Sequence, residues 1–200
     1  FTDSAGNAAS ALALTAFTLD TTANAATQTT AVTTPDNDAT PDVVINVAEA
    51  GTIAIGGTSG CDSSETAVAS GANTITLDSN GAGGSMTDGA YTCTVTFTDS
   101  LGTAASALTL TAFTVDTAVA AATQTTAVTT PTADTTPDVV INVAEAGTIA
   151  VGGTSGCGLS STSAMTSGAN TVTLTASSTD KAYSCTVTFT DSAGNAASAL

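Results

Sequence analysis

Apolar side chains and threonine alternate along residues 90–99, AYTCTVTFTD. From residue 91 to residue 97, one parity carries apolar, aromatic or cysteine side chains, which are those of Tyr91, Cys93, Val95 and Phe97. The other parity carries threonine from residue 92 to residue 98. A period of two predicts a β-strand that buries one face and leaves the other near water.

Further short strands are predicted on both sides of this one. They are rich in β-branched residues and are separated by turn-forming Pro, Gly, Asp and Asn, and they span residues 26–34, 43–47, 52–55, 73–77 and 107–116. No stretch shows the 3.6-residue period of a helix. The pattern therefore predicts an all-β chain without helices, built as antiparallel β-sandwiches of about seven strands each.

The amino-acid sequence itself repeats along the chain, together with the alternation of apolar and polar residues. FTDSAGNAASAL occupies residues 1–12 and again 189–200, and the related FTDSLGTAASAL occupies 97–108. The steps from Phe1 to Phe97 and from Phe97 to Phe189 are 96 and 92 positions. Self-similarity at such a period indicates tandem domains. The restart at residue 189 favours a stretch cut from a longer array over a complete short protein with a ragged repeat.

Three segments follow from this period. Residues 1–20 are expected to be the last strands of a preceding repeat, and a change of parity between Leu14 and Phe17 predicts a bulge or kink in its final strand. Residues 21–117 form a complete repeat. Residues 118–200 form a repeat that lacks the end of its last strand.

The charge of the chain excludes several classes of partner. Seventeen acidic residues stand against one cation, Lys181, which gives a net charge of −16. Nucleic acids are bound through cationic side chains that displace counterions, so nucleic-acid binding is excluded. Anionic membrane surfaces are excluded on the same ground. Nucleophilic catalysis has no histidine or lysine base beside its serines, so we do not expect an enzyme.

Four cysteines fall at matching places, two in each repeat. Four cysteines allow three pairings, and equal placement favours Cys61 with Cys93 and Cys157 with Cys185. A zinc site would need closer spacing and usually histidine, which the chain lacks. Paired cysteines imply an oxidising compartment, so we expect an extracellular or cell-surface protein.

Two short motifs carry a family resemblance. DGAYTC at 88–93 and DKAYSC at 180–185 place Tyr91 and Tyr183 two residues before a cysteine, as in the tyrosine corner of immunoglobulin folds. With TPDVVINVAEAGTIAIGG and NTITL, they make the chain resemble the bacterial immunoglobulin-like domains that occur in tandem in large surface adhesins. The chain departs from antibody domains, because it has no core tryptophan and Cys61 follows the third strand.

The resemblance implies an extracellular rod, with calcium at domain junctions in several such families. Serial stacking of immunoglobulin-like sandwiches would bring one pole of the first repeat against the opposite pole of the second. The candidate calcium ligands at that junction are Asp36, Asp38, Asp88, Asp116, Glu145, Asp191 and Asn195. The alternative is that these residues only form turns. Thr103 replaces the asparagine in the middle copy of the motif, which predicts a weaker site there.

Three functions remain after these exclusions. The favoured one is a non-catalytic structural repeat of an extracellular adhesin, stalk or fibre, whose partners are neighbouring repeats. The second is a filament subunit that donates a β-strand to other copies of itself. The third is a glycan- or protein-binding immunoglobulin-like module.

Overall fold

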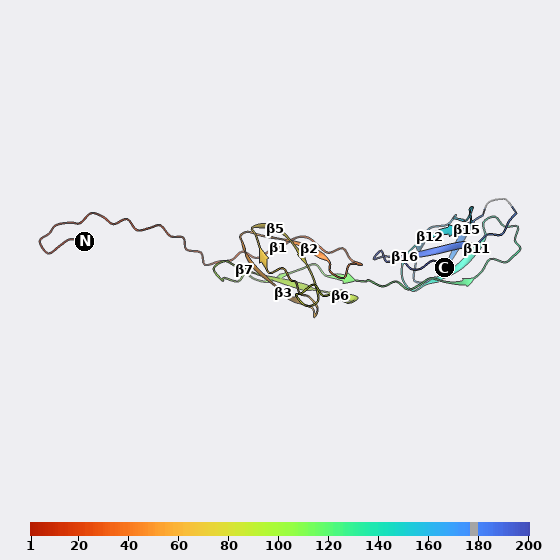
Figure 1. Cartoon of the computed structure of the whole chain (residues 1–200), viewed down its shortest axis with the longest axis horizontal. Helices are drawn as coiled ribbons and strands as arrows, with labels where there is room; N and C mark the ends of the chain where they lie inside the picture. Colours follow the sequence, from red (N-terminus) through yellow and green to blue (C-terminus); the bar gives the residue numbers. More distant parts are fainter. Residues whose placement is uncertain (177–179) are drawn as a thin grey trace.

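The computed structural model describes residues 1–176 and 180–200, and within them the protein is all-β and contains no helix. The predicted fold class of packed antiparallel sheets is confirmed. The strands gather in two units with separate hydrophobic cores, which lie one after the other along the chain (Figure 1). No helix in the described part is long and apolar enough to cross a membrane.

The first unit comprises nine short strands among the described residues. They are β1 (Thr27–Thr30), β2 (Asp42–Val47), β3 (Gly51–Gly57), β4 (Ala67–Val68), β5 (Gly71–Thr76), β6 (Gly89–Tyr91), β7 (Cys93–Asp99), β8 (Leu108–Thr109) and β9 (Phe113–Val115). One sheet has the order β1-β2-β5, another has β4-β3-β7-β8, and β6 pairs with β9.

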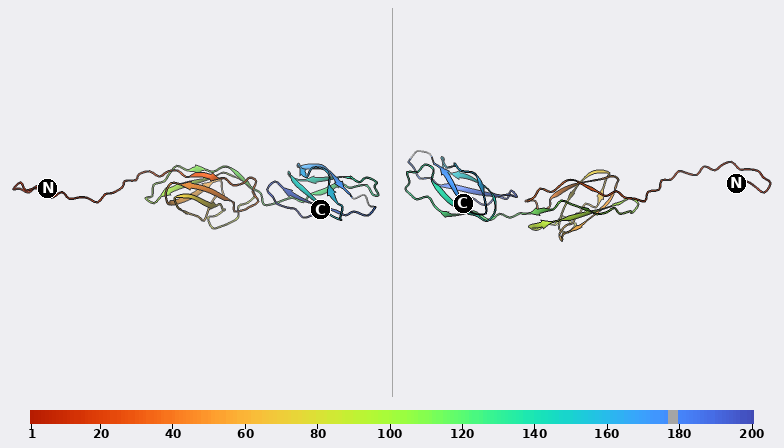
Figure 2. Two further views of the ribbon diagram at one scale, coloured as in Figure 1. Left: turned by 90° about the horizontal axis from the view of Figure 1, so that it is seen from above. Right: turned by 180° about the vertical axis from the view of Figure 1, so that it is seen from behind.

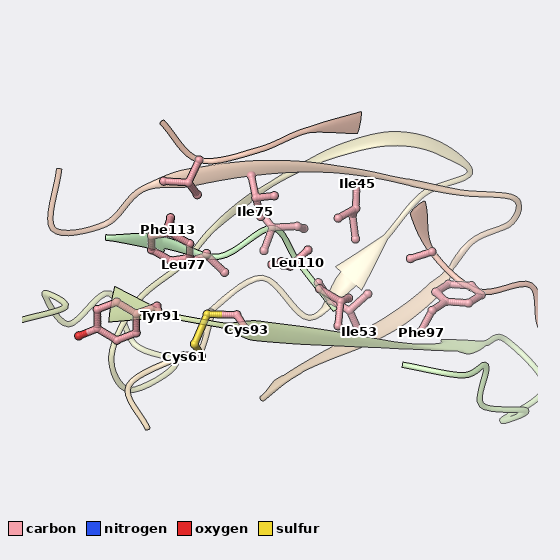
Figure 3. Close-up of a cluster of buried hydrophobic side chains, with 14 of the residues drawn as sticks. Ile45, Ile53, Cys61, Ile75, Leu77, Tyr91, Cys93, Phe97, Leu110 and Phe113 are labelled. Carbon is pink, nitrogen blue, oxygen red and sulfur yellow. A yellow bond between two sulfur atoms is a disulfide. The ribbon is translucent and has the colours of Figure 1, made fainter. Parts of the chain in front are cut away.

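The core of the first unit lies between these sheets (Figure 3). The alternation predicted for residues 90–99 is observed, because Cys93, Val95 and Phe97 are fully buried and the intervening threonines are not. Ile45 and Ile75 face them from the opposite sheet. The last strand is split into β8 and β9, which pair with different strands, β7 and β6. Each sheet thus contributes one apolar face to the core.

The second unit repeats most of this arrangement. Its strands are β10 (Thr123–Thr126), β11 (Asp138–Val143), β12 (Gly147–Gly153), β13 (Gly158–Leu159), β14 (Ala164–Met165), β15 (Gly168–Thr175) and β16 (Cys185–Asp191). They form sheets of order β10-β11-β15-β13 and β14-β12-β16. Among the described residues, β6 and β9 have no counterpart here. Leu200 exchanges two backbone hydrogen bonds with Val187, just as Leu108 pairs with Val95.

Residues 1–19 form an extension that runs away from the first unit (Figure 2), whereas Asp20 and Ala23 already contact that unit. The strand expected near residues 12–20 is not formed, which corrects the sequence prediction. Nearly the same sequence at 108–116 forms strands because it pairs with β7 and β6, and no strand among the described residues lies beside the extension. Leu12, Leu14, Phe17 and Leu19 are at least 79% exposed as a result.

Candidate functional site

The end of the first unit is held together by its turns and by the residues that follow β9. Asp36 donates its backbone N–H to Thr114 O at 2.9 Å, and Asp116 donates its own to Asp36 O at 2.8 Å. Thr117 donates a backbone and a hydroxyl hydrogen bond to Asp88 Oδ1, at 2.8 and 2.7 Å. The Thr117 hydroxyl bond, with the backbone bond behind it, lowers the pKa of Asp88. Three separate loops therefore meet at this end.

An acidic cluster lies where the first unit meets the second. We call it the junction cluster: Asp116, Glu145 and Asp191 each place a carboxylate oxygen within 4.8 Å of the others. Asn195 donates its side-chain amide to Asp116 O across the junction at 2.7 Å and to Asp191 Oδ2 at 2.9 Å. The FTDSAGN turn therefore ties the two units together directly.

Only four of the seven predicted calcium ligands gather in this way. Asp36 Oδ1 accepts the backbone N–H of Asp38, and Asp38 Oδ1 accepts both the N–H and the hydroxyl of Thr40. These two carboxylates stabilise their own turn, in the manner of Asx turns. Asp88 binds Thr117 instead. The turn-forming interpretation therefore describes Asp36, Asp38 and Asp88, whereas Asp116, Glu145, Asp191 and Asn195 meet at the junction.

A second acidic cluster was missed by the sequence analysis. Asp20, Glu49 and Asp99 place carboxylate oxygens within 4.8 Å of one another at the entry to the first unit. We call it the entry cluster. Each member is the repeat equivalent of one member of the junction cluster, so the period itself was the signal for it. Asp99 is only 5% exposed, and its Oδ2 is buried with no hydrogen-bond partner among the described residues.

The two clusters differ because one turn residue differs. Thr103 stands in the first unit where Asn195 stands in the second, and a threonine side chain does not supply the amide that Asp191 Oδ2 receives. The oxygen donors of both clusters are of the kind that Ca²⁺ takes. Lys181, the only lysine or arginine of the chain, does not neutralise either cluster, because its Nζ donates a hydrogen bond to Ser155 O at 2.6 Å.

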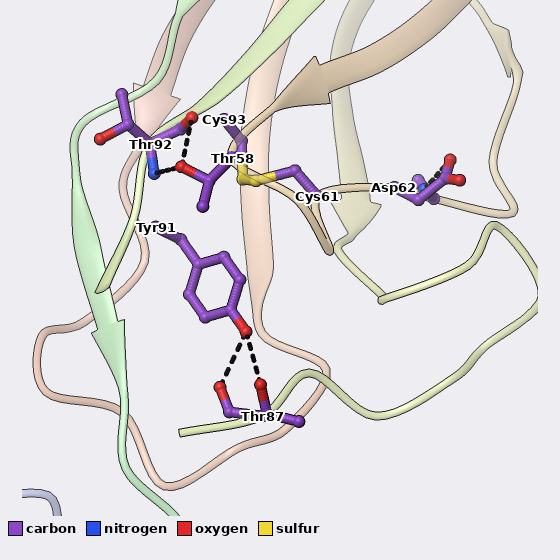
Figure 4. The surroundings of a disulfide bond; sticks show 8 residues. Thr58, Cys61, Asp62, Thr87, Tyr91, Thr92 and Cys93 are labelled. Carbon is purple, nitrogen blue, oxygen red and sulfur yellow. Dashed lines mark hydrogen bonds between the residues drawn. A yellow bond between two sulfur atoms is a disulfide. The ribbon is translucent and has the colours of Figure 1, made fainter. Parts of the chain in front are cut away.

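Each unit contains one disulfide. Cys61 bonds to Cys93 and Cys157 to Cys185, with sequence separations of 32 and 28 positions. Figure 4 shows the first bridge beside Tyr91, whose hydroxyl donates to Thr87 O at 2.8 Å. A tyrosine that bonds back to the chain four residues upstream, just before a cysteine strand, has the geometry of a tyrosine corner. Tyr183 contacts Lys181, whose Nζ lies 4.9 Å from its ring centroid.

A hollow opens along one side of the second unit. We call it the open groove; its volume is about 960 Å³. Its apolar wall includes Val128, Val139, Ile141, Leu174, Val187 and Leu200. In the first unit, the residues that follow Leu108 carry Leu110, Phe113 and Val115 into the core. The groove is therefore the second unit's version of the space that β9 fills.

Comparison with protein-family models and with curated proteins found no match.

Proposed function

We propose that this chain is a non-catalytic structural repeat of an extracellular surface adhesin, stalk or fibre. The observation that carries the proposal is the junction between the units. Asn195 bonds at once to its own turn and to the backbone of the preceding unit, at Asp116 O. A contact of this kind restricts how one unit bends on the next, which a stalk requires of every junction.

The junction is also repeated along the chain. In the entry cluster, Glu49 and Asp99 of the first unit lie beside Asp20, just as Glu145 and Asp191 of the second unit lie beside Asp116 of the first. Units joined by equivalent contacts extend as a line, because each step applies the same rotation and translation. The serial placement of the two units in Figure 1 supports this geometry.

The proposed location and fold family rest on separate observations. Two disulfides, with no free cysteine in the described part, suit an oxidising compartment outside the cytosol. The bond from the Tyr91 hydroxyl to Thr87 O supports an immunoglobulin-like topology. The net charge of −16 suits long chains that stay soluble and do not associate through their sides.

Small-angle X-ray scattering tests the rod. We expect the maximum dimension to rise linearly when residues 21–117, with Thr103→Asn so that every junction has the amide that Asn195 supplies, are repeated two, three and four times in one chain. Asn195→Ala in the 200-residue chain should broaden the distribution of inter-unit distances, whereas Asn7→Ala, in the equivalent exposed turn, should not. Dimensions that grow only as a flexible string of units would overturn the proposal.

A further inference from the structure

The first unit shows what belongs in the open groove. Leu110, Phe113 and Val115 are 3%, 3% and 0% exposed there. Leu110 donates its backbone N–H to Cys93 O at 2.9 Å. The ring of Phe113 stacks on that of Tyr91, with the centroids 5.7 Å apart. This segment therefore closes the core and covers the disulfide.

Polar groups on the rim of the groove add direction and register to these apolar contacts. In the first unit, Gln28 Oε1 accepts both the N–H and the hydroxyl of Thr111, at 2.8 and 3.0 Å. Thr34 Oγ1 accepts the N–H of Thr114 at 3.0 Å. The second unit carries the same residue types at the equivalent positions, Gln124 and Thr130, and both line the groove.

Without such a segment, the second core is less complete. Cys185 and Val128 are only half-buried, whereas their equivalents Cys93 and Val32 are buried. Burial of apolar surface is the main favourable term in folding, so the second unit has a free-energy gain still to be realised. A strand with the sequence of residues 108–116 is the ligand that this surface fits.

One other stretch of the chain has that sequence. Residues 12–20 read LALTAFTLD, against LTLTAFTVD at 108–116. Leu14, Phe17 and Leu19 stand where Leu110, Phe113 and Val115 stand, and they are 84%, 89% and 79% exposed. Leu19 is larger than Val115 by one methylene. The groove has room for it, because the second unit has the small Ala176 where the first unit has Met86. The two positions are equivalent, since Ala176 N donates to Thr135 O as Met86 N donates to Ala39 O.

We propose that residues 13–21 of one copy insert into the open groove of the second unit of another copy and complete its sandwich. Leu14, Phe17 and Leu19 then fill the core. The backbone and hydroxyl of Thr15 donate to Gln124, and the N–H of Thr18 donates to Thr130. Thr21 binds Asp180, as Thr117 binds Asp88.

Residues 13–21 are too far away to fill the groove of their own chain. The extension leaves the first unit at the end opposite to the second unit, so the whole first unit separates residues 13–21 from the groove of their own chain (Figures 1 and 2). Residues 1–11 take no part, because their counterparts 189–199 already form that corner in the accepting copy.

The entry cluster fixes how the next copy is placed. Asp20 lies against Glu49 and Asp99 as Asp116 lies against Glu145 and Asp191. The chain that leaves a donated strand at Asp20 would therefore enter its own first unit in the same way as the chain that leaves β9 at Asp116 enters the second unit. Each contact is head-to-tail, so assembly is open-ended and linear. This inference rests on the rod proposed above and adds that copies join end to end.

The test compares the 200-residue chain with variants by sedimentation velocity and negative-stain microscopy. We expect concentration-dependent linear polymers of the unaltered chain. Deletion of residues 1–11 should preserve them, and deletion of 1–20 should leave monomers. Appending TLTAFTVDT after Leu200 should also leave monomers, because the groove is then filled within the chain.

Point substitutions separate the donor from the rest of the extension. Phe17→Asp should weaken association at least about 100-fold, as expected for a buried aromatic anchor. Phe1→Asp is the matched control and should change nothing, since Phe1 is 97% exposed and lies outside the donor. Neither change touches a packed side chain, so both variants fold.

A register test uses a new intermolecular disulfide. Thr18→Cys together with Thr130→Cys should give a covalent ladder on a non-reducing gel, because the equivalent Thr114 and Thr34 are in contact. Thr15→Cys with Thr130→Cys should not. The inference is overturned if the unaltered chain stays monomeric at millimolar concentration, even if a peptide of residues 12–21 binds it. That result would assign the groove to a strand supplied within a longer chain and leave the rod proposal standing.

Discussion

Thr103→Asn should stabilise the first unit. The change installs the amide that Asn195 supplies in the second unit, where it donates to Asp191 Oδ2 at 2.9 Å. Asp99 Oδ2 is the buried oxygen without a partner in the described part of the chain, and it is the atom that the new amide would reach. The surrounding turn already matches, because Asp99 Oδ1 accepts the N–H of residue 103 as Asp191 Oδ1 accepts that of residue 195.

The size of the gain follows from the burial of that oxygen. A hydrogen bond to a charged group contributes about 1.5–3 kcal/mol. Ordering the asparagine side chain costs about 0.5–1 kcal/mol. We expect a net gain of about 1–2 kcal/mol in the free energy of unfolding of the first unit, which corresponds to roughly 5–10 °C in its melting temperature.

Hydrogen exchange with mass spectrometry measures each unit separately. Protection of β7 reports on the first unit and protection of β16 on the second, so only β7 should exchange more slowly in Thr103→Asn. Asn195→Thr is the reverse change and should reduce protection of β16 by a similar free energy. Asn7→Thr is the control, because Asn7 bonds to Asp3 in the same kind of turn but both residues are exposed. Unchanged or faster exchange of β7 in Thr103→Asn would refute the assignment of Asp99 as an uncompensated buried group.

Three further predictions concern the same units. Replacing Cys61 and Cys93 together by alanine should lower the stability of the first unit by about 3–4 kcal/mol in urea unfolding, because the bridge closes a 32-residue loop in the unfolded chain; a loss below about 1 kcal/mol would contradict this entropic account. Burial raises the pKa of Asp78, but hydrogen bonds from the backbone of Asn80, Gly83 and Gly81 outweigh it, so its pKa in the folded state is below the ordinary value of 3.8. This contribution to stability is present above about pH 4 and is lost as the pH falls through the lowered pKa, so urea unfolding should show a loss in acid that Asp78→Asn abolishes. Calcium should raise the melting temperature of the chain relative to EDTA, and Asp99→Asn should reduce that difference more than Asp38→Asn does; equal melting temperatures in calcium and EDTA would leave both acidic clusters as turn and junction elements only.

The strands were predictable wherever a single strand carries its own pattern. Residues 93–99 alternate so regularly that their buried and exposed faces follow from the letters alone. The pairing of the four cysteines followed from the equal spacing of the repeats. Both depend on features that are local or exactly duplicated in the chain.

Features that depend on a neighbour were harder to predict. Residues 12–20 and 108–116 have nearly the same sequence, yet only the second becomes strand, because edge pairing requires β6 and β7 beside it. The calcium ligands were predicted because their turns lie at the same end of the sandwich. That criterion does not distinguish a free carboxylate from one that stabilises its own turn. Asp38 is such a carboxylate.

The contact between the first turn and the last strand determines how the first unit responds to tension. Asp36 and Val115 form a parallel bridge, with hydrogen bonds from Asp36 N to Thr114 O and from Asp116 N to Asp36 O. A pull on the two ends of the unit loads such bonds in shear, so they must break together and not one after another. Once they do break, the loop between Cys61 and Cys93, a sequence separation of 32, stays closed by the disulfide, and roughly 110 Å of chain is withheld from extension. A stalk made of such units would lengthen in short steps under load and refold from a partly retained structure.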